Sequence, residues 1–255
     1  MKDIYLSVVI PAFDEMANLQ KGVLEKVNIY LDKCKFTSEV IIVDDGSRDG
    51  TVEFLKKFSK DFPRFRVIEN PHTGKGGAVT TGVLSSVGKI VLFTDMDQAT
   101  PIEEIDKLLP FFAKGYDVVI GSRNSKRKGS PISRQIISRG FMLLRTTIVG
   151  LSGISDTQCG FKAFEKEAAH KIFQKIYDMH SGFKKISGSA VTAGFDIELL
   201  FIADRFGYSI KEVPVTWLYV ETRRVSPIKD SVDGVRDLIK IRQNALSGKY
   251  GSKNE

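Results

Sequence analysis

The first half of the sequence alternates short apolar runs with segments in which apolar residues recur every three or four positions. The apolar runs are rich in β-branched residues, as in strands that are buried on both faces of a parallel sheet. They cover residues 6–10, 39–43, 66–68, 89–93 and 117–120. The segments between them have the periodicity of helices that pack through one side. This order predicts an α/β fold in which helices flank a mainly parallel sheet.

Four of the predicted strands end in a polar cluster. The clusters are Pro11-Ala-Phe-Asp-Glu15, Asp44-Asp-Gly-Ser47, Asp95-Met-Asp97 and Gly121-Ser-Arg123. Ligands of open α/β sheets bind beyond the carboxyl ends of the strands. We therefore expect the four clusters to gather at one edge of the sheet and to form the functional site there.

Asp95 and Asp97 have the spacing of a metal site. Residues i and i+2 of an extended segment point to the same side, so both carboxylates can face one cation. Mg²⁺ is usually held by one or two carboxylates together with phosphate oxygens. Two aspartates at this spacing are also common in solvated loops. Their position directly after an apolar strand favours a site for Mg²⁺ or Mn²⁺ that bridges a diphosphate.

The Asp44-Asp45-Gly46-Ser47 cluster has two compatible interpretations. Asp-Gly is a frequent β-turn pair, and Ser47 or Asp49 can cap a helix that begins near Thr51. A carboxylate here can also accept a hydrogen bond from a base imide or a ribose hydroxyl. We expect Asp44 to bind the nucleotide and the remaining residues to form the turn.

The Gly74-Lys75-Gly76-Gly77 segment resembles a phosphate-binding loop only in part. It is not a Walker A loop, because Glu69 stands where the first glycine of that pattern would fall and Gly follows the lysine. A glycine-rich helix start can still approach an anion through its backbone N–H groups. Lys75 is therefore a weak candidate for anion binding.

The second half of the sequence contains a basic stretch followed by an apolar stripe. The stripe consists of Ile137, Phe141, Leu144, Ile148 and Leu151. Arginines at 134, 139 and 145 flank or interrupt it. A buried core helix would show such a stripe, but a basic helix on an anionic membrane surface fits the arginines better. Further along, Arg224 and Lys229 can bind an acceptor phosphate, or they are ordinary surface charges.

Charge and hydropathy narrow the class of protein. The chain has 38 Lys and Arg against 31 Asp and Glu, a formal charge of +7, which admits nucleic-acid binding as an alternative. The basic stretch lacks interleaved aromatic residues, and the acidic clusters would repel phosphate chains, so we expect no nucleic-acid partner. The longest stretch without a charged side chain, residues 76–88, is shorter than the roughly 18 residues of a membrane span. With no signal-peptide pattern at the N-terminus, we expect a cytoplasmic protein.

Taken together, the motifs resemble family 2 glycosyltransferases of the GT-A fold. The matching residues are Val9-Ile-Pro-Ala-Phe-Asp-Glu15, Val43-Asp-Asp-Gly-Ser47, Gly74-Lys-Gly-Gly-Ala78, Asp95-Met-Asp97 and Gly121-Ser-Arg123. Later segments look like the polyprenyl-phosphate branch of that family. They are Asp156-Thr-Gln-Cys-Gly-Phe-Lys162, Phe195-Asp-Ile-Glu-Leu199 and Val213-Pro-Val-Thr-Trp217. The first of these is most similar to dolichyl-phosphate β-glucosyltransferases.

The resemblance implies a nucleotide-sugar donor, most simply UDP-glucose, a polyprenyl or dolichyl phosphate acceptor, and Mg²⁺ or Mn²⁺. It implies that Asp95 and Asp97 hold the metal, with Gln98 assisting, and that Asp97 is catalytic. The residues that it places around the nucleotide sugar are Pro11, Ala12, Asp14, Glu15, Asp44, Asp45, Lys75, Asp95, Arg123, Arg134 and Arg139. Arg123, Arg224 and Lys229 would act on the phosphates of donor and acceptor. Met96 and Gln98 stand where Ala and Gly are frequent in the family.

The expected reaction is a single displacement with inversion, because a lipid phosphate is already anionic and needs no strong base. Alternatives are a mannosyltransferase that uses GDP-mannose, a family 2 enzyme with a non-lipid acceptor, and a non-catalytic nucleotide-binding module. We expect residues 1–225 to form one GT-A domain, in which residues 125–155 lie on the cytoplasmic face of a membrane as a peripheral contact. Residues 226–255 would form a C-terminal amphipathic helix with a frayed tail.

Overall fold

The computed structural model describes residues 3–123, 144–183, 193–218 and 227–251, with the backbone alone at residues 193 and 227–231. Within these residues a sheet of seven strands has the order β3-β2-β1-β4-β6-β5-β7. Its strands are β1 (Leu6–Ala12), β2 (Ser38–Asp44), β3 (Phe65–Glu69), β4 (Ile90–Thr94), β5 (Val118–Arg123), β6 (Phe161–Glu165) and β7 (Ile210–Val215). The strand β6 runs antiparallel to both of its neighbours, and the other pairs are parallel. The predicted mainly parallel α/β fold is confirmed.

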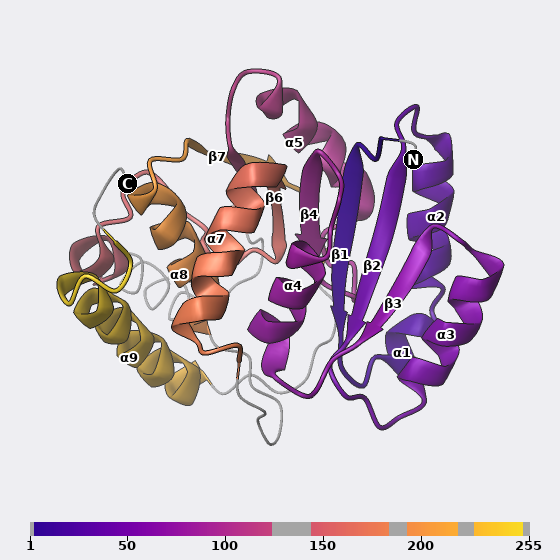
Figure 1. Ribbon diagram of the computed structural model, residues 1–255, viewed down its shortest axis with the longest axis horizontal. Helices are drawn as coiled ribbons and strands as arrows, with labels where there is room; N and C mark the ends of the chain where they lie inside the picture. The colour runs from indigo at the N-terminus through magenta and orange to yellow at the C-terminus, as the bar shows by residue number, and fades with distance from the viewer. Residues whose placement is uncertain (1–2, 124–143, 184–192, 219–226, 252–255) are drawn as a thin grey trace.

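Helices cover both faces of the sheet (Figure 1). One layer contains α4 (Gly74–Leu84), α7 (Lys166–Met179), α8 (Ala193–Arg205) and α9 (Pro227–Leu246). The other contains α1 (Met16–Leu19), α2 (Val23–Lys33), α3 (Thr51–Asp61), the 3₁₀ turn η1 (Ile102–Glu104) and α5 (Ile105–Phe112).

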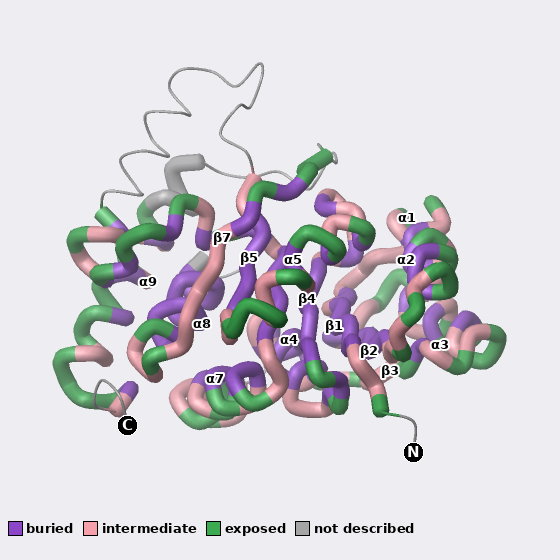
Figure 2. The backbone as a smooth tube through the Cα atoms, turned by 90° about the horizontal axis from the view of Figure 1, so that it is seen from above, coloured by how far each residue is buried: buried purple, intermediate pink, exposed green. Residues whose placement is uncertain are grey.

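Alternation along the strands supplies both cores. In β1, Val9 packs with the α4 and α7 layer, whereas Val8 and Ile10 pack with the α2 layer. The central strands are accordingly buried along their length (Figure 2). A sheet that is apolar on both faces leaves polar groups room only at its ends, which is where the sequence carries them.

Three expected elements differ from the structure. The helical pattern of residues 19–31 is broken between α1 and α2, where Gly22 has a φ of +70° that glycine adopts without strain. The segment 156–164, left without a predicted strand, contributes β6, which lies inside the sheet between β4 and β5. The apolar run over residues 210–220 also predicts one or two strands. Its first part forms β7, and residues 216–218 are not in a strand.

Residues 144–149 are helical, and they correct one feature of the predicted amphipathic segment. Leu144 of the apolar stripe is 44% exposed, whereas Arg145 is only 3% exposed. Arg145 donates hydrogen bonds to the Ile154 carbonyl and to Thr157 Oγ1, so it points into the protein and does not belong to a basic outer face. A periodic pattern cannot reveal these acceptors, because they lie on a following loop. Arg134 and Arg139 lie outside the described residues.

None of the helices in the described part of the chain is both long enough and apolar enough to cross a lipid bilayer.

Candidate functional site

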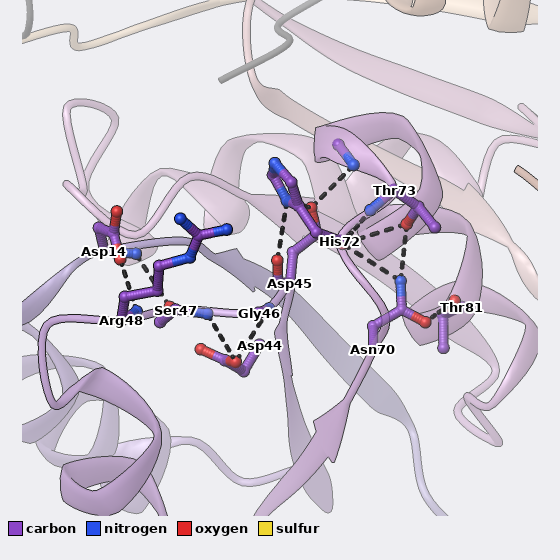
Figure 3. A network of polar contacts seen from close by, with 11 residues as sticks. Asp14, Asp44, Asp45, Gly46, Ser47, Arg48, Asn70, His72, Thr73 and Thr81 are labelled. Atoms are coloured by element: carbon purple, nitrogen blue, oxygen red, sulfur yellow. Dashed lines mark hydrogen bonds and ion pairs between the residues drawn. The ribbon is translucent and has the colours of Figure 1, made fainter. Parts of the chain in front are cut away.

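The first two polar clusters interlock at the carboxyl edge of the sheet. The β1–β2 register pairs Ala12 with Asp44. Beyond it, Asp14 N donates to Ser47 Oγ over 2.9 Å, and Arg48 N donates to Asp14 Oδ1 over 2.8 Å (Figure 3). Asp14 has a φ of +53°, a conformation that aspartate tolerates better than most residues. The expected meeting of these clusters is confirmed.

Asp44 combines a structural role with an unused acceptor. Its Oδ2 accepts hydrogen bonds from Gly46 N and Ser47 N, both over 3.1 Å, and so closes the turn. Its Oδ1 is buried and has no hydrogen-bond partner among the described residues, although the residue is only 3% exposed. A buried carboxylate oxygen without a donor is costly. The position therefore suits a ligand that brings an N–H or O–H group.

Asp45 is buried, and protein donors surround its carboxylate. The backbone N–H groups of Thr73 and Gly74 donate to it over 2.9 and 2.8 Å, and His72 Nδ1 lies 2.9 Å from Oδ2 (Figure 3). These bonds fix the start of α4, which carries Lys75, beside the turn after β2. Phe13 stacks on His72 with ring centroids 4.3 Å apart. Sequence reasoning missed His72, because its partner lies 27 residues earlier.

Asp95, Asp97 and Arg123 line one cavity of about 190 Å³. The other lining residues are Thr94, Ala99, Thr100, Gln158, Gly160 and Trp217. The cavity thus joins the ends of β4 and β5 to the loop before β6 and the segment after β7. The third and fourth polar clusters therefore meet, as expected. Gln158, Gly160 and Trp217 were not predicted as site residues.

Lys75, in the first turn of α4, forms an ion pair with Asp95, one of the residues that line this cavity. Its Nζ lies 2.6 Å from Asp95 Oδ1. Burial alone would lower the pKa of Lys75, but the negative charges of Asp95 and Asp196 raise it above its ordinary value. Burial and the neighbouring Asp95 charge raise the pKa of Asp97. The site therefore holds two carboxylates close enough to repel each other, and an ammonium group that compensates one of them.

The Asp95–Gln98 segment carries side chains of the types that bind a divalent cation. Gln98 Nε2 donates to the Asp95 carbonyl over 2.9 Å, and Gln98 Oε1 is buried without a hydrogen-bond partner in the described chain. Two carboxylates and an amide oxygen are hard ligands of the type that Mg²⁺ and Mn²⁺ bind. Where the structure is described, no three Asp, Glu, His or Cys side chains form a cage of their own. Such a site fits an ion that takes its remaining ligands from a diphosphate and water.

The carboxylate of Asp156 holds the Arg123 guanidinium in place. Arg123 Nε and Nη2 donate to the two oxygens of Asp156, each over 2.7 Å. Burial would raise the pKa of Asp156, but the guanidinium holds it below its ordinary value. The backbone N–H groups of Ser155 and Asp156 in turn donate to Glu212 of β7. The Arg123 side chain at the end of β5 is therefore held by the loop before β6, and β7 holds that loop in turn.

A second ion pair lies behind the cavity. Lys162 of β6 is fully buried, and its Nζ lies 2.5 Å from Asp196 Oδ1 of α8 and 5.3 Å from the centre of the Phe93 ring. Burial would lower the pKa of Arg123, but the hydrogen bonds and charge of Asp156 raise it, with a smaller contribution from the Asp196 charge. Lys162 and Asp196 belong to two of the motifs that resemble the polyprenyl-phosphate branch, Asp156–Lys162 and Phe195–Leu199. Their pairing follows only from the place of β6 in the sheet.

The other predicted site residues have the following positions. Pro11 and Ala12 end β1, half-buried and buried respectively, and Glu15 N donates to Thr51 Oγ1 over 2.9 Å. Arg134, Arg139 and Arg224 lie outside the described residues. Lys229 belongs to α9, but its side chain is likewise outside them.

Comparisons with known proteins agree with this geometry. The model of the family described as Glycosyl transferase family 2 matches residues 7–173. The chain is 30% identical to a dolichyl-phosphate beta-glucosyltransferase from Dictyostelium discoideum and 33% identical to one from Saccharomyces cerevisiae. The alignments cover 99% and 98% of this chain, and 78% and 77% of those proteins.

Among solved structures, a mannosyltransferase from Pyrobaculum calidifontis in complex with GDP-Man and Mn²⁺ is similar with a TM-score of 0.54 at 14% identity. That alignment covers 97% of this chain and 75% of the other. At this identity the likeness shows the fold alone.

Proposed function

Because the chain belongs to glycosyl transferase family 2, we propose that it transfers glucose from UDP-glucose to a polyprenyl phosphate such as dolichyl phosphate. The chain is a hexosyltransferase with the GT-A fold. The observation that carries the proposal is the cavity that brings Asp95, Asp97 and Arg123 together at the carboxyl edge of the sheet. The names of the relatives, matched over nearly the whole chain, support the donor sugar and the lipid acceptor.

The nucleotide end of the donor would occupy the β1–β2 edge. Asp44 Oδ1 would accept the hydrogen bond that it lacks within the described chain, from the base or the ribose. Pro11, Ala12, Asp14 and Glu15 would line the same pocket. We assign Asp45 a positioning role, since its carboxylate already receives the donors that hold α4. Through α4 it places Lys75 next to the diphosphate.

Asp95 and Asp97, with Gln98, would hold Mg²⁺ or Mn²⁺ against the diphosphate. When bound, the ion supplies positive charge where negative charge develops on the departing nucleotide. Lys75 and Arg123 would stabilise the same charge from two other directions. The ion pair with Asp156 keeps the Arg123 guanidinium oriented for this purpose.

The acceptor phosphate would attack the anomeric carbon directly. A phosphate monoester is already anionic near neutral pH, so the chain need only position it in line with the leaving group. A single displacement inverts the anomeric carbon and yields a β-linked product. Arg224 and Lys229 would bind the acceptor phosphate, and Arg134 and Arg139 would bind the nucleotide sugar. We propose that the protein works as a peripheral protein on the cytoplasmic face of a membrane, where the lipid acceptor is found.

The test is a transfer assay with the variant Asp97→Asn. The amide keeps an oxygen that can accept from Ala99 N, as Asp97 Oδ1 does over 3.0 Å, but it removes the charge. We expect glucose transfer to fall by about 100-fold or more, the range for loss of a group that stabilises developing charge. The control is Asp61→Asn, an exposed aspartate at the end of α3. Near-normal transfer by a folded Asp97→Asn protein would overturn the metal role.

The donor panel contains UDP-glucose, UDP-N-acetylglucosamine and GDP-mannose, each with dolichyl and undecaprenyl phosphate. Labelled lipid formed chiefly from UDP-glucose supports the proposal. Preference for GDP-mannose would show that the proposed donor is wrong. Labelled product formed without lipid would show that the proposed acceptor is wrong.

A further inference from the structure

Trp217 is a large aromatic residue in a cavity that is otherwise polar. It is the only tryptophan of the chain, and it lines the same cavity as Asp95, Asp97 and Arg123. The residue follows β7 and is 38% exposed, although tryptophan is on average among the more buried residue types. It is not part of either apolar core. Trp217 therefore belongs to the wall of the cavity rather than to either apolar core.

Backbone hydrogen bonds fix the segment on both sides of Trp217. Thr216 N donates to Glu104 Oε2 over 2.9 Å, and Leu218 N donates to the Ala99 carbonyl over 2.7 Å. The same Ala99 donates its N–H to Asp97 Oδ1. A single residue, Ala99, thus connects the Asp97 carboxylate with the segment that carries the indole. An aromatic wall held in this way is ordered before a ligand arrives, which lowers the entropic cost of binding.

The size of the cavity limits what can lie against the indole. Its volume of about 190 Å³ is below the roughly 300–1,000 Å³ of pockets that enclose a whole small ligand. A ring-sized group fits this volume, and the rest of a nucleotide sugar would extend beyond it. Carboxylates, the Gln158 amide and the Thr100 hydroxyl provide hydrogen-bond partners for hydroxyl groups.

The combination of an aromatic wall and polar groups matches a sugar ring. The face of an indole is electron-rich and attracts weakly positive C–H groups, which a pyranose presents on its faces. The rim of the same ring carries hydroxyls that can use the polar groups. A polyprenyl chain would leave the polar groups without partners.

We propose that the indole of Trp217 packs against the pyranose ring of the transferred hexose and makes the enzyme bind the sugar nucleotide in preference to the free nucleotide. This inference rests on the proposed function and adds a specificity-determining residue to it. The loop from Asp97 to Glu104 and the segment after β7 then act together, one holding the diphosphate end and the other the sugar.

The first measurement uses the intrinsic fluorescence of the protein. Because Trp217 is the only tryptophan, a change in emission reports on this residue alone. With Mg²⁺ present, we expect saturating UDP-glucose to change the emission clearly more than saturating UDP does. Equal changes, or no change with either ligand, would overturn the proposal.

The second measurement is calorimetric titration of two variants with UDP-glucose and UDP. Trp217→Leu removes the aromatic face and Trp217→Phe retains one. We expect the preference for UDP-glucose over UDP to fall by about 3- to 10-fold in Trp217→Leu, the range for one aromatic contact, and to survive largely in Trp217→Phe. The Kd for UDP should stay within about 2-fold in both. Unchanged preference in Trp217→Leu, or equal weakening of both ligands, would contradict the sugar contact.

The same titrations with GDP and GDP-mannose separate this inference from the proposed function. If the donor is GDP-mannose, the Trp217→Leu effect must appear in that pair instead. The wild-type protein could transfer glucose to lipid while wild type, Trp217→Leu and Trp217→Phe all show the same preference for UDP-glucose over UDP. That result would refute the role of Trp217 and leave the proposed function intact.

Discussion

Two oxygen atoms at the candidate site are buried without a hydrogen-bond donor in the part of the chain that is described: Asp44 Oδ1 and Gln98 Oε1. They belong to different halves of the site. The first lies at the β1–β2 edge, where the nucleotide is proposed to bind, and the second lies beside the aspartates proposed to hold the metal. At the level of single residues, an unpaired buried oxygen marks a group proposed to bind a ligand. Asp45, in contrast, uses its carboxylate for hydrogen bonds within the fold.

Asp44→Asn tests the first of these atoms. The asparagine oxygen can still accept from Gly46 N and Ser47 N, so the turn and the stability of the fold should be preserved. The amide would then present N–H groups to the ligand donor. We expect the Kd for UDP to rise by about 10- to 100-fold, the range for hydrogen bonds to a charged acceptor. Calorimetry measures it, and unchanged affinity would remove Asp44 from the nucleotide pocket.

Lys75→Met tests the cation that faces Asp95. Removing the ammonium frees Asp95 Oδ1 from its ion pair, so we expect the protein without nucleotide to bind Mn²⁺ several-fold more tightly. Binding of the diphosphate should weaken, because one positive charge is lost. Paramagnetic resonance of free Mn²⁺ gives the first value, and Lys75→Arg serves as the control that keeps the charge. Weaker Mn²⁺ binding in Lys75→Met would show that the lysine does not compete with the ion.

At the scale of elements, β6 organises the cavity. It inserts antiparallel between β4 and β5, which places Lys162 against Phe93 and brings the 155–160 loop to the ends of both neighbours. Arg123 is held by Asp156 from this loop, and Asp95 lies against Gly160. The 155–160 loop therefore contacts both the positive side chain of Arg123 and the negative side chain of Asp95.

Gly160→Ala tests that contact. A Cβ at residue 160 would overlap the Asp95 carboxylate, which would have to move away from its present position. We expect transfer activity to fall at least about 10-fold, because misplacement of a reacting group by about 1 Å is costly. Stability should fall by about 1–3 kcal/mol, as for other overpacked sites. Thermal unfolding measures the loss of stability, and the transfer assay measures the loss of activity. Normal activity would show that transfer does not depend on the present position of the Asp95 carboxylate.

At the scale of the whole molecule, the C-terminal helix shares a core with the sheet. Leu238 and Ile241 of α9, together with Tyr250 beyond it, pack in the same cluster as Val9 and Phe93. Tyr250 donates to Glu198 Oε1 over 2.6 Å, and His180 Nε2 lies 2.8 Å from Glu198 Oε2. The division into residues 1–225 and 226–255 stays a prediction, but these contacts tie α9 firmly to α8.

Tyr250→Phe tests this connection through the pH dependence of stability. Burial would raise the pKa of Glu198, but the bonds from His180 and Tyr250 lower it below its ordinary value of 4.5. The ionised carboxylate therefore stabilises the fold above that pH, and the contribution is lost as the pH falls through the lowered folded-state pKa. We expect Tyr250→Phe to lose about 1.5–3 kcal/mol at pH 7, as for a hydrogen bond to a charged group.

As the pH falls through the lowered folded-state pKa of Glu198, the difference in stability between Tyr250→Phe and wild type should shrink, since the carboxylate becomes protonated in both. Denaturant unfolding at several pH values measures the two curves. Parallel curves over the whole range would show that the Tyr250–Glu198 bond carries none of the pH dependence.

The class of fold, the polar clusters and the edge at which they meet could all be predicted from the amino-acid sequence. Those features are local: apolar runs of strand length and the residues directly after them, such as Asp44, Asp95 and Arg123, are adjacent in the chain. Which of these groups the protein itself holds, and which are left for a ligand, depends on contacts between distant segments. Asp45 and Asp44 look equivalent in sequence, yet one is surrounded by donors from residues 70–74 and the other keeps an unpaired oxygen. Likewise β6, Lys162 with Asp196, and the wall formed by Trp217 depend on segments that lie far apart in the chain, and no periodic pattern records such distances.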